Sequence, residues 1–201
     1  MTVDVVPEMK KSERTRLRIL DSAAYMLSVK GYAKLRMQDV ASHADTHGPA
    51  IYYYFESRDA LVAEVLCAGV RGMRENLERV LASLPASTGP LDRVLIAVEQ
   101  HLRYVLQMSH YPRASIRNSS QIPLELRTKQ IEEEATYGEL WKQLVQAAVD
   151  AGETRPDVDT PMVRRLILGG LSWTAEWWDH DRGDIDRLVA AAVDMVRNAL
   201  T

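Results

Sequence analysis

His43, Asp45 and His47 are the residues whose types and spacing come nearest to a metal-binding group in this 201-residue chain. Imidazole and carboxylate side chains are zinc ligands. Only three such residues lie here, however, and they span a predicted turn with no cysteine or fourth ligand nearby in the sequence. We therefore expect no metal at this position.

The other residues that could take part in covalent chemistry are scattered along the chain. Cys67, the single cysteine, follows the apolar run 61–66, so we interpret it as a small buried hydrophobic residue without a disulfide partner. His101 and His110 are isolated, and the sequence contains no nucleophile–base–acid order, glycine-rich phosphate loop or paired-metal pattern. We expect no catalytic residue and no cofactor.

Positive charge is concentrated near the N-terminus, although the whole chain carries a net charge of −3. Residues 10–36 contain eight lysines and arginines against two acidic residues, whereas residues 37–201 carry a net charge of −7. This asymmetry indicates a polyanionic partner for the basic segment. A solvated basic helix face is the simpler alternative, and charge alone does not separate the two.

The pattern of apolar residues and breaks predicts an all-α fold. Val and Ile do not alternate with polar residues as strands require. Ser12 is a candidate N-cap and Gly31 a candidate stop for a first helix, whose apolar stripe is Leu17, Leu20, Ala24 and Leu27. Prolines, glycines and serines divide the remainder. The predicted helices span residues 12–30, 37–44, 49–55, 57–81, 91–109, 112–119, 124–151, 161–178 and 184–200.

The two short helices 37–44 and 49–55 form a candidate helix-turn-helix, because a tight turn joins them and a basic helix precedes them. The second helix of such a motif enters a major groove about 12 Å wide and must be narrow and partly polar. Ile51 and Phe55 lie four residues apart and can face a core. The motif predicts DNA binding.

The remaining residues of the second helix can then contact DNA. Phenol hydroxyls of Tyr52, Tyr53 and Tyr54 can donate to phosphates, and the Ala50 methyl can contact a thymine methyl. His47 precedes this helix, and we interpret it as a helix cap or a DNA contact. Packing between helices is the alternative for the tyrosines, and we expect it for at least one of the three.

The stretches 37–44 (MQDVASHA) and 51–61 (IYYYFESRDAL) resemble the DNA-binding signature of the Tet repressor family. Gly31 and Tyr32 at the end of the first helix fit the same pattern, so the resemblance covers about residues 12–66. It implies an N-terminal three-helix helix-turn-helix domain followed by a C-terminal helical ligand-binding and dimerisation domain. The expected division is an arm at 1–11, a DNA-binding domain at 12–56 and a larger domain at 57–201.

The same resemblance implies roles for individual residues. Tyr52 and Tyr54 fall at phosphate-contacting or supporting positions, Arg58 replaces a lysine that grips a phosphate, and Arg36 stands where a threonine often caps the second helix. The segment 45–50 (DTHGPA) departs from the family pattern, losing its turn glycine and a lysine, which suggests an unusual operator. The predicted DNA-binding residues are Arg36, Gln38, Thr46, His47, Gly48, Ala50, Tyr52, Tyr53, Tyr54 and Arg58.

The larger domain is similar to the family's variable ligand-binding region. Ser-Trp followed by Glu-Trp-Trp at 172–178 is similar to a subgroup that responds to acyl-CoA thioesters, in which case Arg113, Arg117 and Asn118 would meet an anionic headgroup. Ordinary core packing is the alternative for each aromatic residue. The predicted ligand-lining residues are Tyr104, Met108, Tyr111, Arg117, Trp141, Trp173 and Trp177.

Family members pair their last two helices with those of a second subunit, and two features here look similar. Trp173 and Trp177 share one helix face beside Gly169 and Gly170. The last helix carries a second apolar stripe, for which the monomer core is the alternative partner: Ile185, Leu188, Val189, Ala192, Val196 and Ala199. We expect a homodimer.

The sequence thus predicts a ligand-responsive transcriptional repressor. It is expected to bind a palindromic double-stranded DNA operator as a dimer and to be released by a small apolar effector. No signal peptide or membrane span is recognisable, so we expect a cytoplasmic protein without a membrane partner. A helical enzyme would require an acid–base or metal cluster. A ligand-independent architectural DNA binder would require positive charge throughout, and residues 37–201 are acidic.

Overall fold

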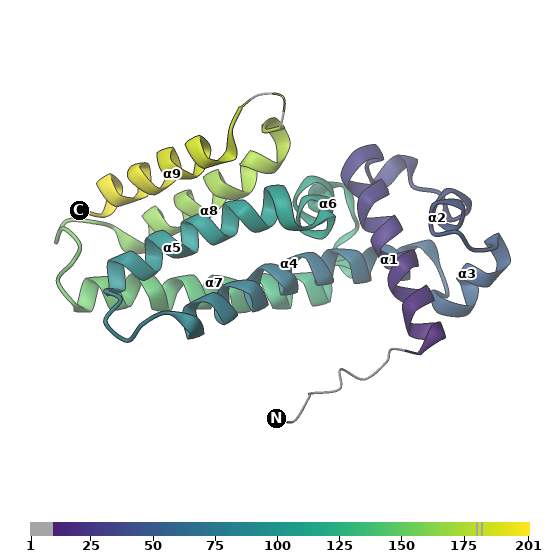
Figure 1. The fold of residues 1–201 in the computed structure, drawn as a ribbon, viewed down its shortest axis with the longest axis horizontal. Coiled ribbons are helices and arrows are strands. Elements are labelled where there is room, and N and C mark those ends of the chain that lie inside the picture. The colour runs from purple at the N-terminus through teal and green to yellow at the C-terminus, as the bar shows by residue number, and fades with distance from the viewer. Residues whose placement is uncertain (1–9, 180, 182) are drawn as a thin grey trace, which may run out of the picture.

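The computed structural model describes residues 10–179, 181 and 183–201, and the part of the chain it describes is helical with no strand (Figure 1). The predicted all-α fold is confirmed. The predicted arm at 1–11 lies mostly outside the described residues. The α-helices are α1 (Lys11–Lys30), α2 (Met37–His43), α3 (Gly48–Tyr54), α4 (Arg58–Ser83), α5 (Pro90–Arg103), α6 (His110–Asn118), α7 (Thr128–Asp150), α8 (Thr160–Trp177) and α9 (Ile185–Leu200).

Helices α1, α2 and α3 form a small head at one end, and α5, α7, α8 and α9 form a longer body at the other (Figure 1). Helix α4 runs from the head into the body, and α6 lies between the two. Residues buried in the head include Ile19 and Leu27 of α1, but also Leu61 and Leu66 of α4 and Ala114 of α6. The head core therefore continues past residue 56, and the division of the chain at that residue stays a proposal.

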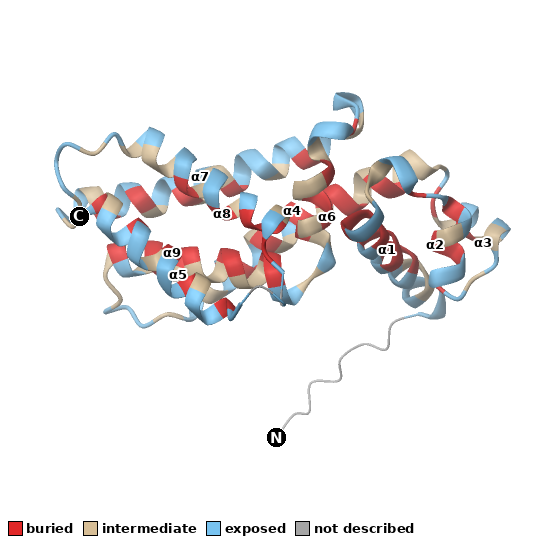
Figure 2. Cartoon of the chain, turned by 90° about the horizontal axis from the view of Figure 1, so that it is seen from above, coloured by how far each residue is buried: buried red, intermediate tan, exposed pale blue. Residues whose placement is uncertain are grey.

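The body has its own hydrophobic core, seen as red inward faces of the helices in Figure 2. Trp141 of α7 is fully buried in it, with Leu102 of α5 and Leu171 of α8. Helix α9 packs on α5 through an apolar stripe that is buried within the single chain: Ile185, Val189, Ala192, Val196 and Leu200. The expectation that the α9 stripe serves a dimer is wrong for Ile185, Val189, Ala192 and Val196, because the monomer core already covers them, whereas Leu188 and Ala199 of the predicted stripe are half-buried.

The predicted helix ends are mostly within a few residues of the observed ones. Ser57 caps α4 by accepting a hydrogen bond from the Ala60 N–H at 3.0 Å, and Gly31 ends α1 with a φ of 78°, which favours glycine. Ser12 lies inside α1 instead of capping it, because the Glu13 carboxylate accepts from the Lys10 N–H at 3.1 Å one turn earlier.

Further differences arise where local patterns are ambiguous. The helix predicted to 109 ends at Arg103 and continues as a π-helical turn, η2 (Tyr104–Met108). The segment before α7 contains a short 3-10 turn, η4 (Leu124–Leu126), instead of the start of the predicted helix. Leu17, assigned to the apolar stripe of α1, is 42% exposed. No helix among the described residues combines the length and apolar character needed to cross a membrane.

Candidate DNA-binding head and effector cavity

The predicted helix-turn-helix is formed by α2, a turn at residues 44–47, and α3. The Thr46 N–H donates to the Ala41 carbonyl at 2.9 Å, which closes the turn. Asp45 occupies the left-handed region with a φ of 47°, a conformation that aspartate tolerates better than most residues. Ile51 and Phe55 are 0% and 3% exposed, so the prediction that they face the core is confirmed.

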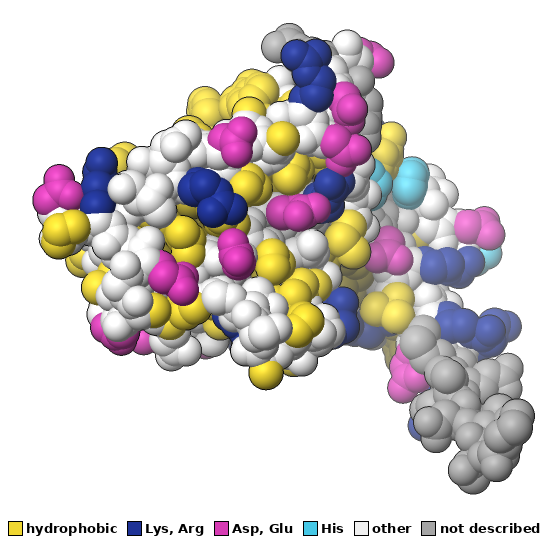
Figure 3. All heavy atoms as spheres, turned by 60° about the vertical axis from the view of Figure 1, so that its left-hand side comes forward, with side chains coloured by type: hydrophobic (Ala, Val, Ile, Leu, Met, Phe, Trp, Pro, Cys, Tyr) yellow, Lys and Arg dark blue, Asp and Glu magenta, His cyan; other side chains and the backbone are white. Residues whose placement is uncertain are grey.

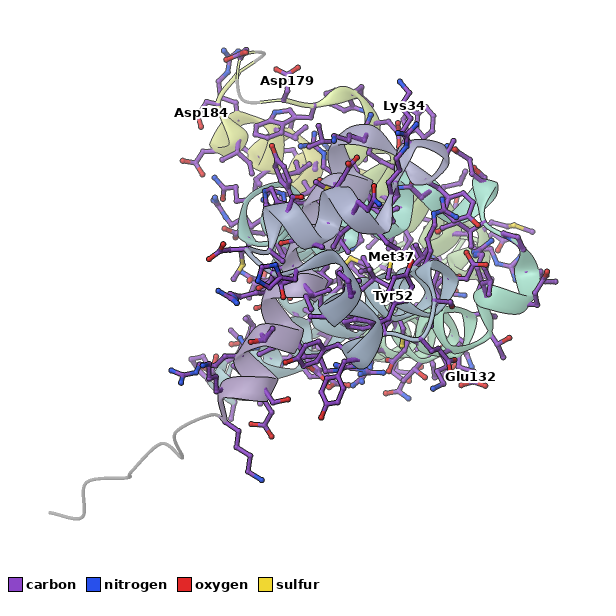
Figure 4. All side chains as sticks on the ribbon, turned by 90° about the vertical axis from the view of Figure 1, so that its right-hand side faces the viewer. Lys34, Met37, Tyr52, Glu132, Asp179 and Asp184 are labelled. Atoms are coloured by element: carbon purple, nitrogen blue, oxygen red, sulfur yellow. The ribbon has the colours of Figure 1, made fainter. Side chains whose placement is uncertain are left out.

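Helix α3 turns its other faces to solvent at the end of the head that faces the viewer in Figure 4. Tyr52 and Tyr53 are 55% and 81% exposed, whereas Tyr54 is half-buried and lies edge-on to Tyr53, with 5.0 Å between ring centroids. One of the three tyrosines therefore packs on the head core. His47 is exposed at the N-cap of α3 without a capping hydrogen bond from its side chain.

The other predicted DNA-binding residues lie around this exposed face, except for Arg58. Arg36 and Gln38 are exposed at the start of α2, and Thr46, Gly48 and Ala50 are half-buried at the turn and the start of α3. Arg36 occupies the N-cap of α2 without a side-chain capping bond. Dark-blue lysine and arginine side chains are visible on the head at the right of Figure 3.

Arg58 has a different environment from the one the resemblance implied. Its Nε donates to the Leu35 carbonyl at 3.0 Å, its Nη2 donates to the Tyr32 carbonyl, and its guanidinium lies 4.0 Å from the centroid of the Tyr32 ring. Asp59 lies 3.4 Å from Nη1. The guanidinium is thus occupied by the segment between α1 and α2, and the structure favours a positioning role for Arg58 over a phosphate contact.

His43, Asp45 and His47 are not brought together as a group of potential metal ligands. The His43 Nδ1 lies 3.0 Å from the Ser22 hydroxyl, and its ring stacks on Tyr25 with 5.0 Å between centroids. His43 therefore belongs to the contact between α2 and α1. No group of three or more potential metal ligands occurs among the residues that the structure describes.

The seven predicted ligand-lining residues do not all come together in one pocket, although Arg117 and Trp177 share a surface hollow of about 560 Å³ with Arg113. Trp141 is fully buried, whereas Met108, Trp173 and Trp177 are 58%, 64% and 45% exposed. Tyr104 is half-buried and packs against Gly72 of α4, where a Cβ would lie 2.5 Å from the Tyr104 hydroxyl. Packing and surface exposure thus separate residues that helical spacing alone had grouped.

The three residues assigned to an anionic headgroup are also engaged within the protein. Arg113 donates to the Ala175 and Trp178 carbonyls at 3.2 and 2.7 Å, at the end of α8. Arg117 donates to the Ser28 carbonyl at 3.0 Å and pairs with Glu176 at 3.5 Å. Asn118 is 1% exposed. Arg113 and Arg117 line the same hollow, but their guanidinium groups already have partners within the protein, and Asn118 is not part of the lining.

A cavity of about 200 Å³ opens instead between α4, α5, α6, α7 and α8. Its buried residues are Val70, Met73, His101, Ser115 and Tyr137. Its more exposed rim consists of Ile116, Ser119, Glu134, Gly138, Leu168 and Ser172. Such a site, apolar with a few convergent polar groups, is typical of a small-molecule pocket. Sequence reasoning missed it, although His101 within the apolar face of α5 was a detectable signal.

His101 is the unusual group in this cavity. It is 2% exposed, its Nδ1 lies 3.0 Å from the Tyr137 hydroxyl, and its Nε2 is buried with no hydrogen-bond partner among the described residues. Burial lowers the pKa of His101 from 6.5 to about 4, so the ring is neutral at pH 7. Burial also raises the pKa of Tyr137, an effect that Trp141 opposes.

Helix α6 contacts both the cavity and the head. Ser115, Ile116 and Ser119 line the cavity. On the head side, the Tyr111 hydroxyl donates to Asp21 of α1 at 2.7 Å. Asn118 donates to the Leu27 carbonyl at 3.1 Å and accepts from the Tyr32 N–H at 2.7 Å, which holds the end of α1. A displacement of α6 at the cavity would therefore be transmitted to the head.

Helix α8 presents an uncovered apolar face. Met162, Leu166, Trp173 and Trp177 recur at helical spacing and are 45–75% exposed, and a Cβ at Gly169 or Gly170 would have nothing within 4 Å. Yellow hydrophobic side chains are visible on the upper part of the body in Figure 3, where α8 and α9 lie in Figure 1. Apolar patches of this kind on a soluble protein mark interaction surfaces.

Comparison with known proteins identifies the class of molecule that these features define. Residues 19–65 match the bacterial regulatory proteins of the tetR family, and residues 87–200 match the tetracyclin repressor-like C-terminal domain. The second match alone covers more than half of the chain. The protein belongs to the TetR family of transcriptional regulators, with an N-terminal helix-turn-helix and a C-terminal helical domain.

Individual relatives cover nearly the whole chain. The transcriptional repressor KstR2 of Rhodococcus jostii is 26% identical over 178 residues, which are 88% of this chain and 84% of KstR2. The structure of AibR with isovaleryl coenzyme A and operator DNA has a TM-score of 0.81 at 18% identity, covering 94% of this chain and 100% of AibR. FadR of Bacillus subtilis with stearoyl-CoA has a TM-score of 0.76 at 17% identity, covering 92% and 99%. These two structures share the fold.

Proposed function

We propose that this protein is a homodimeric transcriptional repressor that binds a palindromic operator and releases it when a small, largely apolar effector occupies the cavity beside α6. The observation that carries the proposal is the position of α6, whose residues line the cavity on one side and bond to the end of α1 on the other. Such a regulator acts on bacterial DNA in the cytoplasm.

The exposed side of α2 and α3 is the proposed DNA-reading surface. Tyr52 and Tyr53 are exposed on α3 and can donate to phosphates, and His47 and Ala50, at the start of the same helix, are the proposed base-reading residues. Arg58 supports this surface from behind by holding the segment before α2. The remaining proposed contacts are Arg36, Gln38, Thr46, Gly48 and Tyr54.

The apolar face of α8 is the proposed dimer contact. Two heads are required to read the two halves of a palindrome, with half-sites about 34–36 Å apart or a longer interval of the same kind. The open space at Gly169 and Gly170 allows close approach of a second helix. On α9, Met195 is 55% exposed and extends the apolar surface, whereas the buried α9 stripe does not contribute.

Release requires that the effector bind one arrangement of the dimer more tightly than the other. To shift the ratio of the two arrangements from 1:99 to 99:1, the effector must bind the favoured arrangement more tightly by about 5.5 kcal/mol. By linkage, the operator then weakens effector binding by the same factor as the effector weakens operator binding. The cavity and the head are joined by the packing of α6 on α1 and by the polar contacts of Tyr111 and Asn118, and these polar contacts can be removed singly by mutation.

The effector belongs to the apolar metabolites, and an acyl-CoA thioester is one candidate. The solved structures of AibR and FadR hold isovaleryl coenzyme A and stearoyl-CoA. For this chain a short acyl group fits better than a long one, because a cavity of about 200 Å³ is smaller than the usual ligand pocket. The nucleotide part of coenzyme A would have to remain outside the cavity.

The test is a thermal-shift screen of acyl-CoA thioesters and apolar metabolites, followed by titration of the operator complex with each stabilising compound. Tyr111→Phe removes the hydrogen bond to Asp21 without opening a cavity, so we expect unchanged effector affinity but several-fold less operator release. Tyr104→Phe is the matched control and should behave as the parent protein. Compounds that stabilise the protein but never change its affinity for DNA would refute the coupling.

A further inference from the structure

The effector cavity is notable for the charge that its lining lacks. Among the described residues, neither lysine nor arginine lines it, and Glu134 on the rim is the ionised group. Gln130 holds this rim together, since its Nε2 lies 2.7 Å from the Ser119 hydroxyl and 2.8 Å from the Glu134 carboxylate. A carboxylate or phosphate drawn into the cavity would lose its water without gaining a cation.

The hydrogen bond between His101 and Tyr137 decides which ring nitrogen carries the proton. If Nδ1 carried it, the Tyr137 hydroxyl would accept, and its own proton would have no acceptor among the described residues. If the hydroxyl donates to Nδ1 instead, the Tyr137 proton is satisfied and, within this pair, the Nε2–H of His101 is left without a partner; the Trp141 Nε1–H lacks one in either arrangement. The second arrangement leaves fewer buried groups unsatisfied, so Nε2 is a donor.

A buried donor without a partner is costly to a folded protein unless a ligand or water satisfies it. His101 lines the cavity, lies opposite no protein acceptor at Nε2, and stays neutral at pH 7. The surrounding side chains are apolar on the α4 side, at Val70 and Met73. The lining also holds the hydroxyls of Ser115, Ser119 and Ser172, so His101 adds a ring N–H donor to a partly polar space. This donor can set both the orientation and the chemistry of an occupant.

We propose that His101 selects the effector by donating from Nε2–H to the oxygen of a compact, uncharged carbonyl group: a ketone, ester, amide or thioester. This inference rests on the proposed function, in that the cavity is taken to be the effector site. It excludes free carboxylic acids as occupants and assigns to Tyr137 the positioning of the His101 ring. A free carbonyl metabolite and the acyl end of a thioester present the same group to His101.

Binding of matched probes to the full-length protein without DNA tests this directly. Acetophenone and α-methylstyrene differ only in carbonyl oxygen against methylene, benzoate supplies the anion, and benzylamine the cation. We expect acetophenone to bind on the order of tenfold more tightly than α-methylstyrene, the value of one hydrogen bond, and benzoate and benzylamine to bind more weakly than acetophenone. Long-range ¹H–¹⁵N spectra should show His101 protonated at Nε2, with that resonance shifting when acetophenone is added.

The matched variant is His101→Phe, which keeps a ring of similar size and removes the donor. It should bind acetophenone and α-methylstyrene equally. Isovaleryl-CoA, with isovalerate as its anionic control, separates the two sources of the carbonyl. Acetophenone binding together with tighter binding of the thioester indicates an acyl-CoA effector, and acetophenone binding without thioester binding indicates a free carbonyl compound. Either result supports the inference, and the spectra of the parent protein decide it even if the variant fails to fold.

Equal binding of acetophenone and α-methylstyrene by the parent protein would overturn the inference, as would tighter binding of benzoate or benzylamine. The inference would also be overturned if the Nε2 resonance did not shift at saturating acetophenone. The same holds if none of these probes bound and the cavity held water only. Acetophenone binding through His101 without operator release would leave this inference standing and refute the effector part of the proposed function. If compounds release the operator equally well from the parent protein and from His101→Phe, the effector part of the proposed function would stand and this inference would be refuted.

Discussion

Two arginines at the starts of α2 and α4 are expected to have different roles despite their similar chemistry. Arg36 is exposed at the N-cap of α2, whereas the Arg58 guanidinium is bound to backbone carbonyls of the preceding segment. Arg36→Ala should weaken binding to all DNA sequences and lower the dependence of log K on log salt by about one unit, as for one lost phosphate contact. Filter binding or fluorescence anisotropy over a salt series measures this.

Arg58→Ala should instead lower the stability of the head and leave the salt slope unchanged. Two part-buried hydrogen bonds to the Leu35 and Tyr32 carbonyls are lost, which lowers the free energy of unfolding by about 1–3 kcal/mol. Arg58→Lys is the control and should restore little of this, because an ammonium reproduces neither the paired donors nor the stacking on Tyr32. A salt slope that falls by one unit in Arg58→Ala would show that this arginine contacts a phosphate after all.

His101 makes the stability of the protein depend on pH. Because its pKa is about 4 in the folded protein and 6.5 when unfolded, the unfolded chain binds the proton first as the pH falls. The contribution is fully present above pH 6.5 and is lost as the pH falls toward 4, at up to about 1.4 kcal/mol per pH unit. Urea unfolding at several pH values should show a shallower loss in His101→Phe than in the parent protein. Identical slopes would place His101 in a hydrated environment.

At the scale of elements, the close approach of α4 and α6 depends on Gly69. A Cβ at this position would lie 2.6 Å from the Tyr111 carbonyl oxygen, which is backbone and cannot move aside alone. Gly69→Ala should therefore separate the helices, lower stability by about 1–3 kcal/mol and reduce operator release by the effector. Thermal unfolding and operator titration measure the two effects.

Gly72→Ala on the same helix is the matched comparison. Its Cβ would meet the Tyr104 hydroxyl, the far end of a flexible side chain that can swing away. We expect a smaller loss of stability and normal release. Equal losses of stability in Gly69→Ala and Gly72→Ala would contradict the view that the backbone contact between α4 and α6 is the constrained one.

The helices could be predicted because their ends are encoded locally. Three helix ends show this. Gly31 ends α1 with a positive φ, the Ser57 hydroxyl caps α4, and Pro90 begins α5 with its fixed φ. The π-helical turn η2 could not be predicted in this way, since its hydrogen-bonding pattern departs from the α-helical spacing on which the apolar pattern was judged.

The DNA-reading surface was accessible to sequence reasoning because it lies within one continuous segment with a recognisable pattern. The cavity was not, because it joins residues that are far apart in the sequence. His101 and Tyr137 are separated by 36 positions, and five helices contribute to the lining. Spacing showed that Trp173 and Trp177 share a face, but only the packing of α8 shows that this face points to solvent.

At the scale of the whole molecule, the uncovered face of α8 predicts that the protein is a dimer in solution. Leu166 is 75% exposed at the middle of this face, so Leu166→Glu should place two charges in the contact without disturbing the monomer core. Sedimentation at micromolar concentration should show a dimer for the parent protein and a monomer for the variant. The control is Arg165→Glu, on the neighbouring exposed position.

The dimer prediction also bears on operator affinity. A monomeric Leu166→Glu variant that keeps a normal helical spectrum should lose operator binding by orders of magnitude, because each head alone reads half a site. If the variant stays dimeric, another surface holds the two subunits together.

The most direct test of a dimeric, operator-binding regulator is selection of bound sequences from a random DNA pool. The number of protein chains bound to the most enriched sequence is then measured. We predict an inverted repeat that binds two copies of the chain, or a multiple of two, with specificity lost in Ala50 and His47 variants. A single asymmetric site bound by one stable monomer, or no sequence enrichment, would contradict it.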